Sequence, residues 1–130
     1  MIGLDGPQPE RTFVWIPSIK AVVGGVVVFE NTHVWMADTQ TAKSHTDWLA
    51  TLQRIQDLKP ATVIPGHYLG TPTVQSVAFT GDYIKAFDIE TAKAKDSTAL
   101  IAAMKKRYPN LKDESSLELG AKVAKGEMKW

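Results

Sequence analysis

The segment AVVGGVVVF, residues 21–29, constrains the fold of this chain more than any other feature. Its apolar residues do not alternate with polar ones, which is the pattern of a strand that is covered on both faces. Gly24 and Gly25 divide the segment, and they indicate a tight turn, a bulge or a close approach of another backbone. The segment therefore predicts a layered α/β or αββα fold.

Three further segments are predicted to be extended. β-Branched and aromatic residues predict a short strand at 11–17, and residues 32–38 suit one more short extended piece. The run ATVIP at 61–65 predicts a strand that stops at its Pro-Gly turn. All the expected strands therefore lie in the first half of the chain.

Helices are predicted between and after these strands. Apolar residues recur at helical spacing within 42–58, where Thr39 or Thr41 can cap the helix and a proline follows it. Three later helices are expected over about 73–94, from Asp96 or Ser97 to Tyr108, and from Asp113 to Gly126. Gly81 lies inside the first of these and costs about 1 kcal/mol relative to alanine. We expect one domain over 1–130, with a helical tail over 73–130.

Length and composition indicate a single ordinary globular domain. The 130 residues are 44% hydrophobic and 22% charged, and cysteine is absent, which removes disulfides and thiolate metal sites. The net charge of +1 gives no global field for nucleic acid or an anionic membrane. The longest apolar run is far shorter than the ~20 residues that span a bilayer. No signal peptide is visible, and the compartment stays open.

Three histidines are the candidates for chemistry, because the sequence has no Gly-rich phosphate loop and no nucleophile elbow. His45 shares a helix face with leucines and is interpreted as a packing residue. His33 lies close enough to Asp38 in sequence for an oriented pair or two metal ligands. His67 follows an apolar strand at the Pro-Gly turn, and it is the first candidate for a metal ligand.

The order of segments around His67 resembles the C-terminal half of metallo-β-lactamase-fold hydrolases. The resemblance covers roughly residues 13–67: KAVVGGVVVF matches the strand that leads into the family's Gly-Asp pair, TDWLATLQRIQDLKP matches the helix, and ATVIPGH matches the final Pro-Gly-His turn. The resemblance implies a partial αββα half-sandwich. It also implies that His67 is a zinc ligand.

Two departures from the family pattern limit what this chain can bind. Gly25 stands where the family has an aspartate that bridges two metals, and the His-x-His-x-Asp-His motif of the family's N-terminal half does not occur. A catalytic zinc generally keeps three protein ligands and a water. The family pattern offers His67 alone, so His33 and Asp38 would complete a site only if the fold brought them together.

Two classes of function follow. In the first, the chain is a fragment or truncated form of a zinc-dependent hydrolase that is inactive alone, and MIGLDG at its start has the character of an internal segment. In the second, it is a non-catalytic binding or self-assembly domain that uses the half-fold. We expect no tightly bound zinc in the chain alone. The expected partner is the missing N-terminal half or a second copy in a homodimer, either of which would cover an open sheet face.

Overall fold

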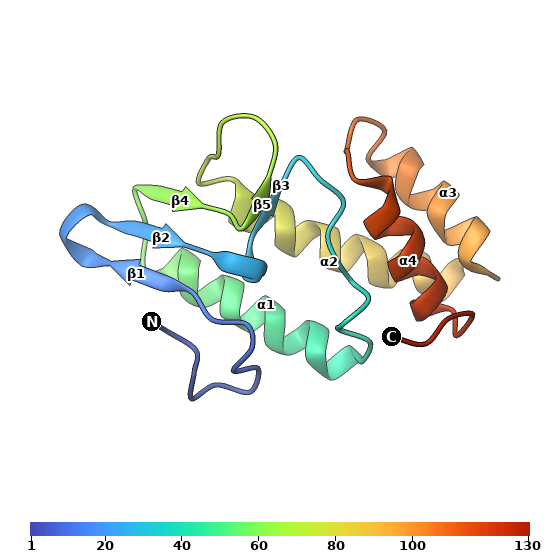
Figure 1. Ribbon diagram of the computed structural model, residues 1–130, viewed down its shortest axis with the longest axis horizontal. Coiled ribbons are helices and arrows are strands. Elements are labelled where there is room, and N and C mark those ends of the chain that lie inside the picture. Colours follow the sequence, from blue (N-terminus) through green and yellow to red (C-terminus); the bar gives the residue numbers. More distant parts are fainter.

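The computed structural model describes residues 1–130 and contains four helices and two small sheets (Figure 1). The strands are β1 (Val14–Ile16), β2 (Ala21–Val23), β3 (Phe29–Glu30), β4 (Thr62–Ile64) and β5 (His67–Tyr68). The helices are α1 (Ala42–Asp57), α2 (Ser76–Lys93), α3 (Ser97–Arg107) and α4 (Glu114–Ala124). The predicted α/β class, with strands first and helices dominating the second half, is confirmed. None of the helices combines the length and apolar character that a membrane span requires.

The larger sheet has the order β1-β2-β4, with β1 antiparallel and β4 parallel to the central β2. The parallel pair requires a long connection, and α1 lies within it and packs behind the sheet (Figure 1). Successive side chains of β2 point to opposite faces. Val22 is therefore buried on the α1 side together with Val63, whereas Val23 lies on the other face.

The apolar run at 21–29 is divided between the two sheets. β2 ends at Val23, a short 3₁₀ turn covers Gly25–Val27, and β3 pairs with β5 in the second sheet. The predicted close approach of another backbone is confirmed, because the Gly66 N–H donates to the Gly25 carbonyl at 2.9 Å. A Cβ at Gly66 would lie 2.2 Å from that oxygen, so only glycine fits there.

α1 begins and ends as its sequence predicts. Thr41 is the N-cap and forms a capping box with Ser44, and the helix ends at Asp57, just before Pro60. Gly81 does not interrupt α2. It lies where α1 and α2 pack together, and a Cβ added there would meet the side chains of α1 at ordinary contact distance.

α2 carries the second sheet and the helical tail. The Thr80 hydroxyl, buried inside α2, accepts a hydrogen bond from the Phe29 N–H at 2.9 Å and so fixes β3 on this helix. α3 and α4 pack on each other, and α3 packs on α2 at the end far from β1, β2 and β4 (Figure 1). The extended piece expected at 32–38 forms no strand; only Thr32 makes an isolated bridge, with Lys112.

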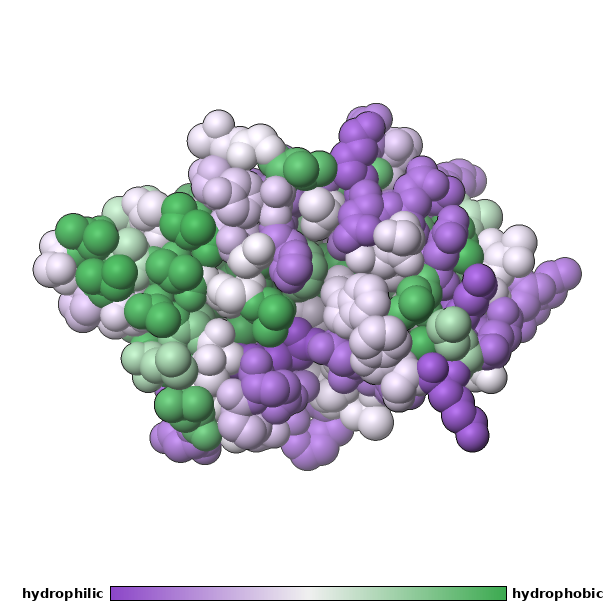
Figure 2. All heavy atoms as spheres, in the orientation of Figure 1, coloured by the Kyte–Doolittle hydropathy of each residue, from purple (hydrophilic) through white to green (hydrophobic).

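The face of the larger sheet that points away from α1 is not covered by any helix. We call it the outer face. Its central row consists of Val14, Val23 and Ile64, with Val14 37% and Val23 42% exposed. Ile19 and Val26 are also exposed near it, and Figure 2 shows hydrophobic residues gathered at this end of the molecule. The expectation that the apolar run is covered on both faces therefore fails for the end of β2.

Candidate functional site

A pocket of about 300 Å³ lies beside the turn that carries His67. We call it the His67 pocket. It is lined by Arg11, Val26, Phe29, Trp35, Asp38, His67, Asp113 and Ser116. These residues come from the N-terminal segment, the β2–β3 turn, β3, the loop before α1, β5 and the start of α4. The pocket therefore joins parts of the chain that are far apart in sequence.

His67 is presented to solvent by the sequence around it. Pro65 and Gly66 end β4, and the hydrogen bond from Gly66 to Gly25 places β5 alongside β3. The imidazole is exposed and stacks on Phe29, with ring centroids 4.9 Å apart and planes 13° from parallel. Neither ring nitrogen makes a hydrogen bond within the chain, so both are available to a ligand.

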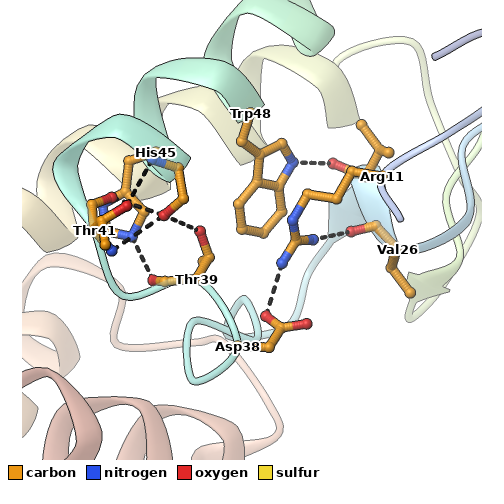
Figure 3. Close-up of polar contacts among 9 residues, drawn as sticks. Arg11, Val26, Asp38, Thr39, Thr41, His45 and Trp48 are labelled. Atoms are coloured by element: carbon orange, nitrogen blue, oxygen red, sulfur yellow. Dashed lines mark hydrogen bonds and ion pairs between the residues drawn. The ribbon is translucent and has the colours of Figure 1, made fainter. Parts of the chain in front are cut away.

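Asp38 lies in the same pocket but is already paired. Arg11 donates to its Oδ1 at 2.7 Å and to the Val26 carbonyl at 3.1 Å (Figure 3). The Arg11 guanidinium also lies 3.7 Å from the centre of the Trp48 ring. Burial lowers the pKa of Arg11 and Asp38 opposes this shift, yet arginine stays charged in proteins. A metal at Asp38 would therefore compete with a buried cation.

Asp113 is the other carboxylate of the pocket, and its side chain caps the start of α4. It is the N-cap of that helix, where it accepts from the Ser116 hydroxyl at 2.6 Å and from the Ser115 hydroxyl at 2.8 Å. Burial opposes its ionisation, but these hydrogen bonds outweigh burial and lower the pKa of Asp113. The pocket thus holds a carboxylate whose ionised form is favoured more than that of a free aspartate.

The structure does not bring His33 into the pocket. His33 is only 1% exposed, and its Nδ1 lies 2.9 Å from the Tyr83 hydroxyl. Burial lowers the pKa of His33 and favours the neutral ring. His33, Asp38 and His67 do not converge, and no group of three or more His, Asp or Glu side chains is placed to hold a metal ion.

His45 is buried, as its apolar helix face predicts, but it does more than pack. Its Nδ1 lies 2.6 Å from Asp88 Oδ1, and its Nε2 lies 2.7 Å from the Thr39 carbonyl. These partners were not predicted, because Asp88 lies on a different helix, α2, far from His45 in sequence.

Two other groups that shape the pocket were missed in the sequence. Glu30 is buried, and its carboxylate accepts from the N–H and the hydroxyl of Thr73, which fixes the loop that follows His67. Trp130 packs edge-on against Trp35, a wall of the pocket, with ring centroids 4.9 Å apart. The only indication of this buried role in the sequence was the position of Glu30, an acidic residue at the end of the apolar run 21–30.

Comparison with known proteins does not assign the chain to a family. A scan against models of protein families gave no match, and a search of curated proteins found no significant relative.

Proposed function

We propose that this chain forms one wall of a zinc-hydrolase site of the metallo-β-lactamase type, with His67 as its zinc ligand. The other ligands would come from a chain segment outside residues 1–130. In such a site, a bound zinc would supply hydrolytic chemistry at a carbonyl or similar centre. The contribution of this chain is to hold one imidazole on a rigid turn at the edge of a pocket.

One observation carries the proposal. The resemblance assigns metal-binding roles to the positions of Gly25 and His67, and these positions are adjacent in the fold because Gly66 is hydrogen-bonded to Gly25. The His67 imidazole is exposed and makes no hydrogen bond within the chain, so its nitrogens are free to bind a metal. Neighbouring aromatic side chains, Phe29 and Trp35, supply an apolar wall for a substrate.

The residues of the chain alone do not fit a catalytic zinc. His67 offers one nitrogen, Asp38 is paired with Arg11, and Asp113 is occupied by its serines. One free ligand falls short of the three that a catalytic zinc keeps. We therefore assign no catalytic step to this chain by itself.

The coding sequence upstream of Met1 tests the proposal most directly. A strand followed by His-x-His-x-Asp-His in the same reading frame would support it. In that longer protein, His67→Ala should lower zinc occupancy and hydrolysis together, while Leu69→Ala, an exposed neighbour, should change neither. A stop codon and a promoter directly upstream would contradict the proposal.

Replacing Gly25 by aspartate gives a second test on the chain as it is. Gly25 has φ +52°, a region that aspartate tolerates, and the nearest atom to an added Cβ is the Thr12 carbonyl at 3.6 Å. Gly25→Asp should tighten zinc binding by about tenfold, or roughly 1.4 kcal/mol, and His67→Ala should remove the gain. Gly70→Asp is the matched control, because Gly70 also has positive φ and open space. Equal gains in both variants would contradict a site at His67.

The outer face favours a second candidate function, self-assembly. Val14 and Val23 lie exposed side by side on an apolar row, and α3 and α4 pack elsewhere. Apolar surface of this kind, gathered rather than scattered, is typical of interaction sites. A second copy placed on this face would form a two-fold dimer, the commonest closed assembly.

Sedimentation equilibrium at micromolar concentration decides this second candidate. The chain should sediment as a dimer, and Val23→Lys should convert it to a monomer. Ile89→Lys, at an exposed apolar residue of α2, should leave the dimer intact. A monomeric parent chain would contradict self-assembly and leave the hydrolase proposal standing.

A further inference from the structure

His45 lies between two hydrogen-bond acceptors. Its ring is on α1 and is only 7% exposed. Nδ1 lies 2.6 Å from Asp88 Oδ1 on α2, and Nε2 lies 2.7 Å from the carbonyl oxygen of Thr39, in the loop before α1. One side chain therefore joins two helices and a loop.

The chemistry of these contacts fixes the protons. A neutral imidazole has one N–H and one bare nitrogen. The Thr39 carbonyl can only accept, so Nε2 carries a proton. An ionised carboxylate can also only accept, so Nδ1 carries one as well. The Asp88 side chain is 46% exposed, and its contact with water favours the ionised carboxylate over a protonated one.

We infer that His45 is a doubly protonated imidazolium in the folded protein, and that it is a positioning residue for the wall of the His67 pocket. Thr39 directly follows Asp38, which is held by Arg11 (Figure 3). The Thr39 hydroxyl also donates to the Ser44 hydroxyl at 2.8 Å, so the end of this loop is tied to α1 twice.

Two side chains of α1, one helical turn apart, thus contact the segments that line the pocket. His45 holds the Thr39 carbonyl, and Trp48 lies under the Arg11 guanidinium and donates to the Val27 carbonyl at 2.9 Å. Loss of one proton from His45 leaves a bare nitrogen facing either Thr39 or Asp88. That change loosens the loop which carries Trp35 and Asp38.

On α1, Lys43 and Asp47 pair with each other. The Lys125 ammonium, just after α4, donates to the carbonyls of Thr91 and Ala94 at the end of α2. Apart from His45 itself, Asp88 is the only ionisable residue that lines the small cavity at the ring. The positioning role rests on the proposed function of the pocket, whereas the charge state of His45 stands without it.

Imidazole-detected ¹H–¹⁵N NMR of the labelled full chain near neutral pH, without zinc, tests the charge state. Spectra of His45→Gln and His67→Gln assign the signals. His45 should show two protonated nitrogens, and His33 should show one bare nitrogen. A bare nitrogen in the His45 ring would overturn the inference, including the case in which Asp88 holds the proton.

The indole N–H signal of Trp35 tests the positioning role. As pH rises, this signal should shift with the same midpoint as the His45 ring in the parent chain and in His67→Gln. Asp88→Asn removes the facing charge and should move both midpoints to lower pH together. The pH-dependent shift should be lost in His45→Gln. A Trp35 signal that does not move, or that follows His67, would overturn the role. These NMR results do not depend on zinc, so they can hold even if the zinc-binding tests of the proposed function fail.

Discussion

The two ends of the molecule differ in how fully their apolar surfaces are covered. We call β1, β2 and β4 the sheet end, and α3 and α4 the helical end. The sheet end leaves the apolar row of Val14 and Val23 open to solvent, although the other face of the same strands is buried against α1. The helical end buries its apolar face and closes its helix termini with side chains. The helical end therefore covers its own apolar surface, whereas the sheet end leaves part of its apolar surface exposed.

Closure of the helical end rests on a few named contacts. Asp96 accepts from the Ala99 N–H at 2.8 Å and caps α3, and Glu127 accepts from the Ser97 N–H at 2.8 Å at the same helix start. Lys125 donates to the Ala94 carbonyl at 2.6 Å, just past the end of α2. Such contacts satisfy the backbone groups that every helix terminus leaves unpaired.

The largest contrast is expected between two glycines. Gly66→Ala places a methyl group 2.2 Å from the Gly25 carbonyl and should destabilise the fold by about 3 kcal/mol or more. Gly81→Ala adds a methyl group 3.7 Å from the Leu49 and Leu52 side chains, inside a helix, and should be neutral or stabilise by up to about 1 kcal/mol. Urea denaturation measures both. Similar losses in the two variants would mean that the Gly25–Gly66 contact does not constrain the sheet end.

The next effect is expected at Arg11. Arg11→Ala leaves the Val26 carbonyl without its donor and uncovers the Trp48 ring, so it should cost about 2–4 kcal/mol. Arg54 is exposed on α1, and Arg54→Ala should change stability by no more than about 0.5 kcal/mol. Thermal and urea denaturation of the pair check this. Equal effects would show that the Arg11 contacts add nothing beyond a surface charge.

A pH effect is expected from His33, which packs beneath the start of α4. Its folded pKa lies below the value of 6.5 for a free histidine, so the unfolded chain binds more protons once pH falls below about 6.5. Stability should therefore fall with pH in that window, by at most about 1.4 kcal/mol per pH unit from this group. The lowered pKa of Asp113 adds a separate loss, below its free value of 3.8. Urea denaturation at several pH values should show a flatter profile between pH 6.5 and 5 for His33→Gln.

The smallest expected effect concerns a helix cap. Asp96→Ala removes the acceptor for the Ala99 N–H and should cost about 1 kcal/mol. Asp96→Asn keeps an acceptor and should lose only a fraction of that. Amide hydrogen exchange in the first turn of α3 should accelerate in the alanine variant alone. Unchanged exchange would show that Glu127 suffices to close this helix start.

Local signals predicted much of this fold. Thr41 and the proline after Lys59 set the ends of α1, and Asp96 and Asp113 begin their helices as expected. These signals succeed because capping and proline sterics act within a few residues. The division of 21–29 between two sheets could not be predicted from local signals. An apolar pattern indicates that a segment is a strand, but it does not indicate which other strand it pairs with.

The candidate site was less accessible to sequence reasoning. The Pro-Gly turn correctly predicted the end of the strand before His67, but His67 itself begins a further short strand, β5, which was not predicted. The partners of the other side chains are tertiary: Asp38 meets Arg11, His33 meets Tyr83, and no periodicity links either pair. A single polar residue in an apolar stretch indicates that its side chain needs a hydrogen-bond partner in the fold. It does not indicate which residue that partner is.

The pairing of distant strands has a consequence for how the chain folds. Val22 must find Val63, and Phe29 must find His67, so the β2–β4 and β3–β5 pairs form only after long loops have closed. α2, α3 and α4 are consecutive and meet through short connections, which favours rapid assembly. We expect the helices to form first and the strands to join last, leaving apolar β-strand edges unprotected in the interval. Pulse-labelled hydrogen exchange during refolding should then show late protection of the Gly24 amide, which donates to the Ile64 carbonyl at 2.8 Å. Protection there as early as in α3 would contradict this order.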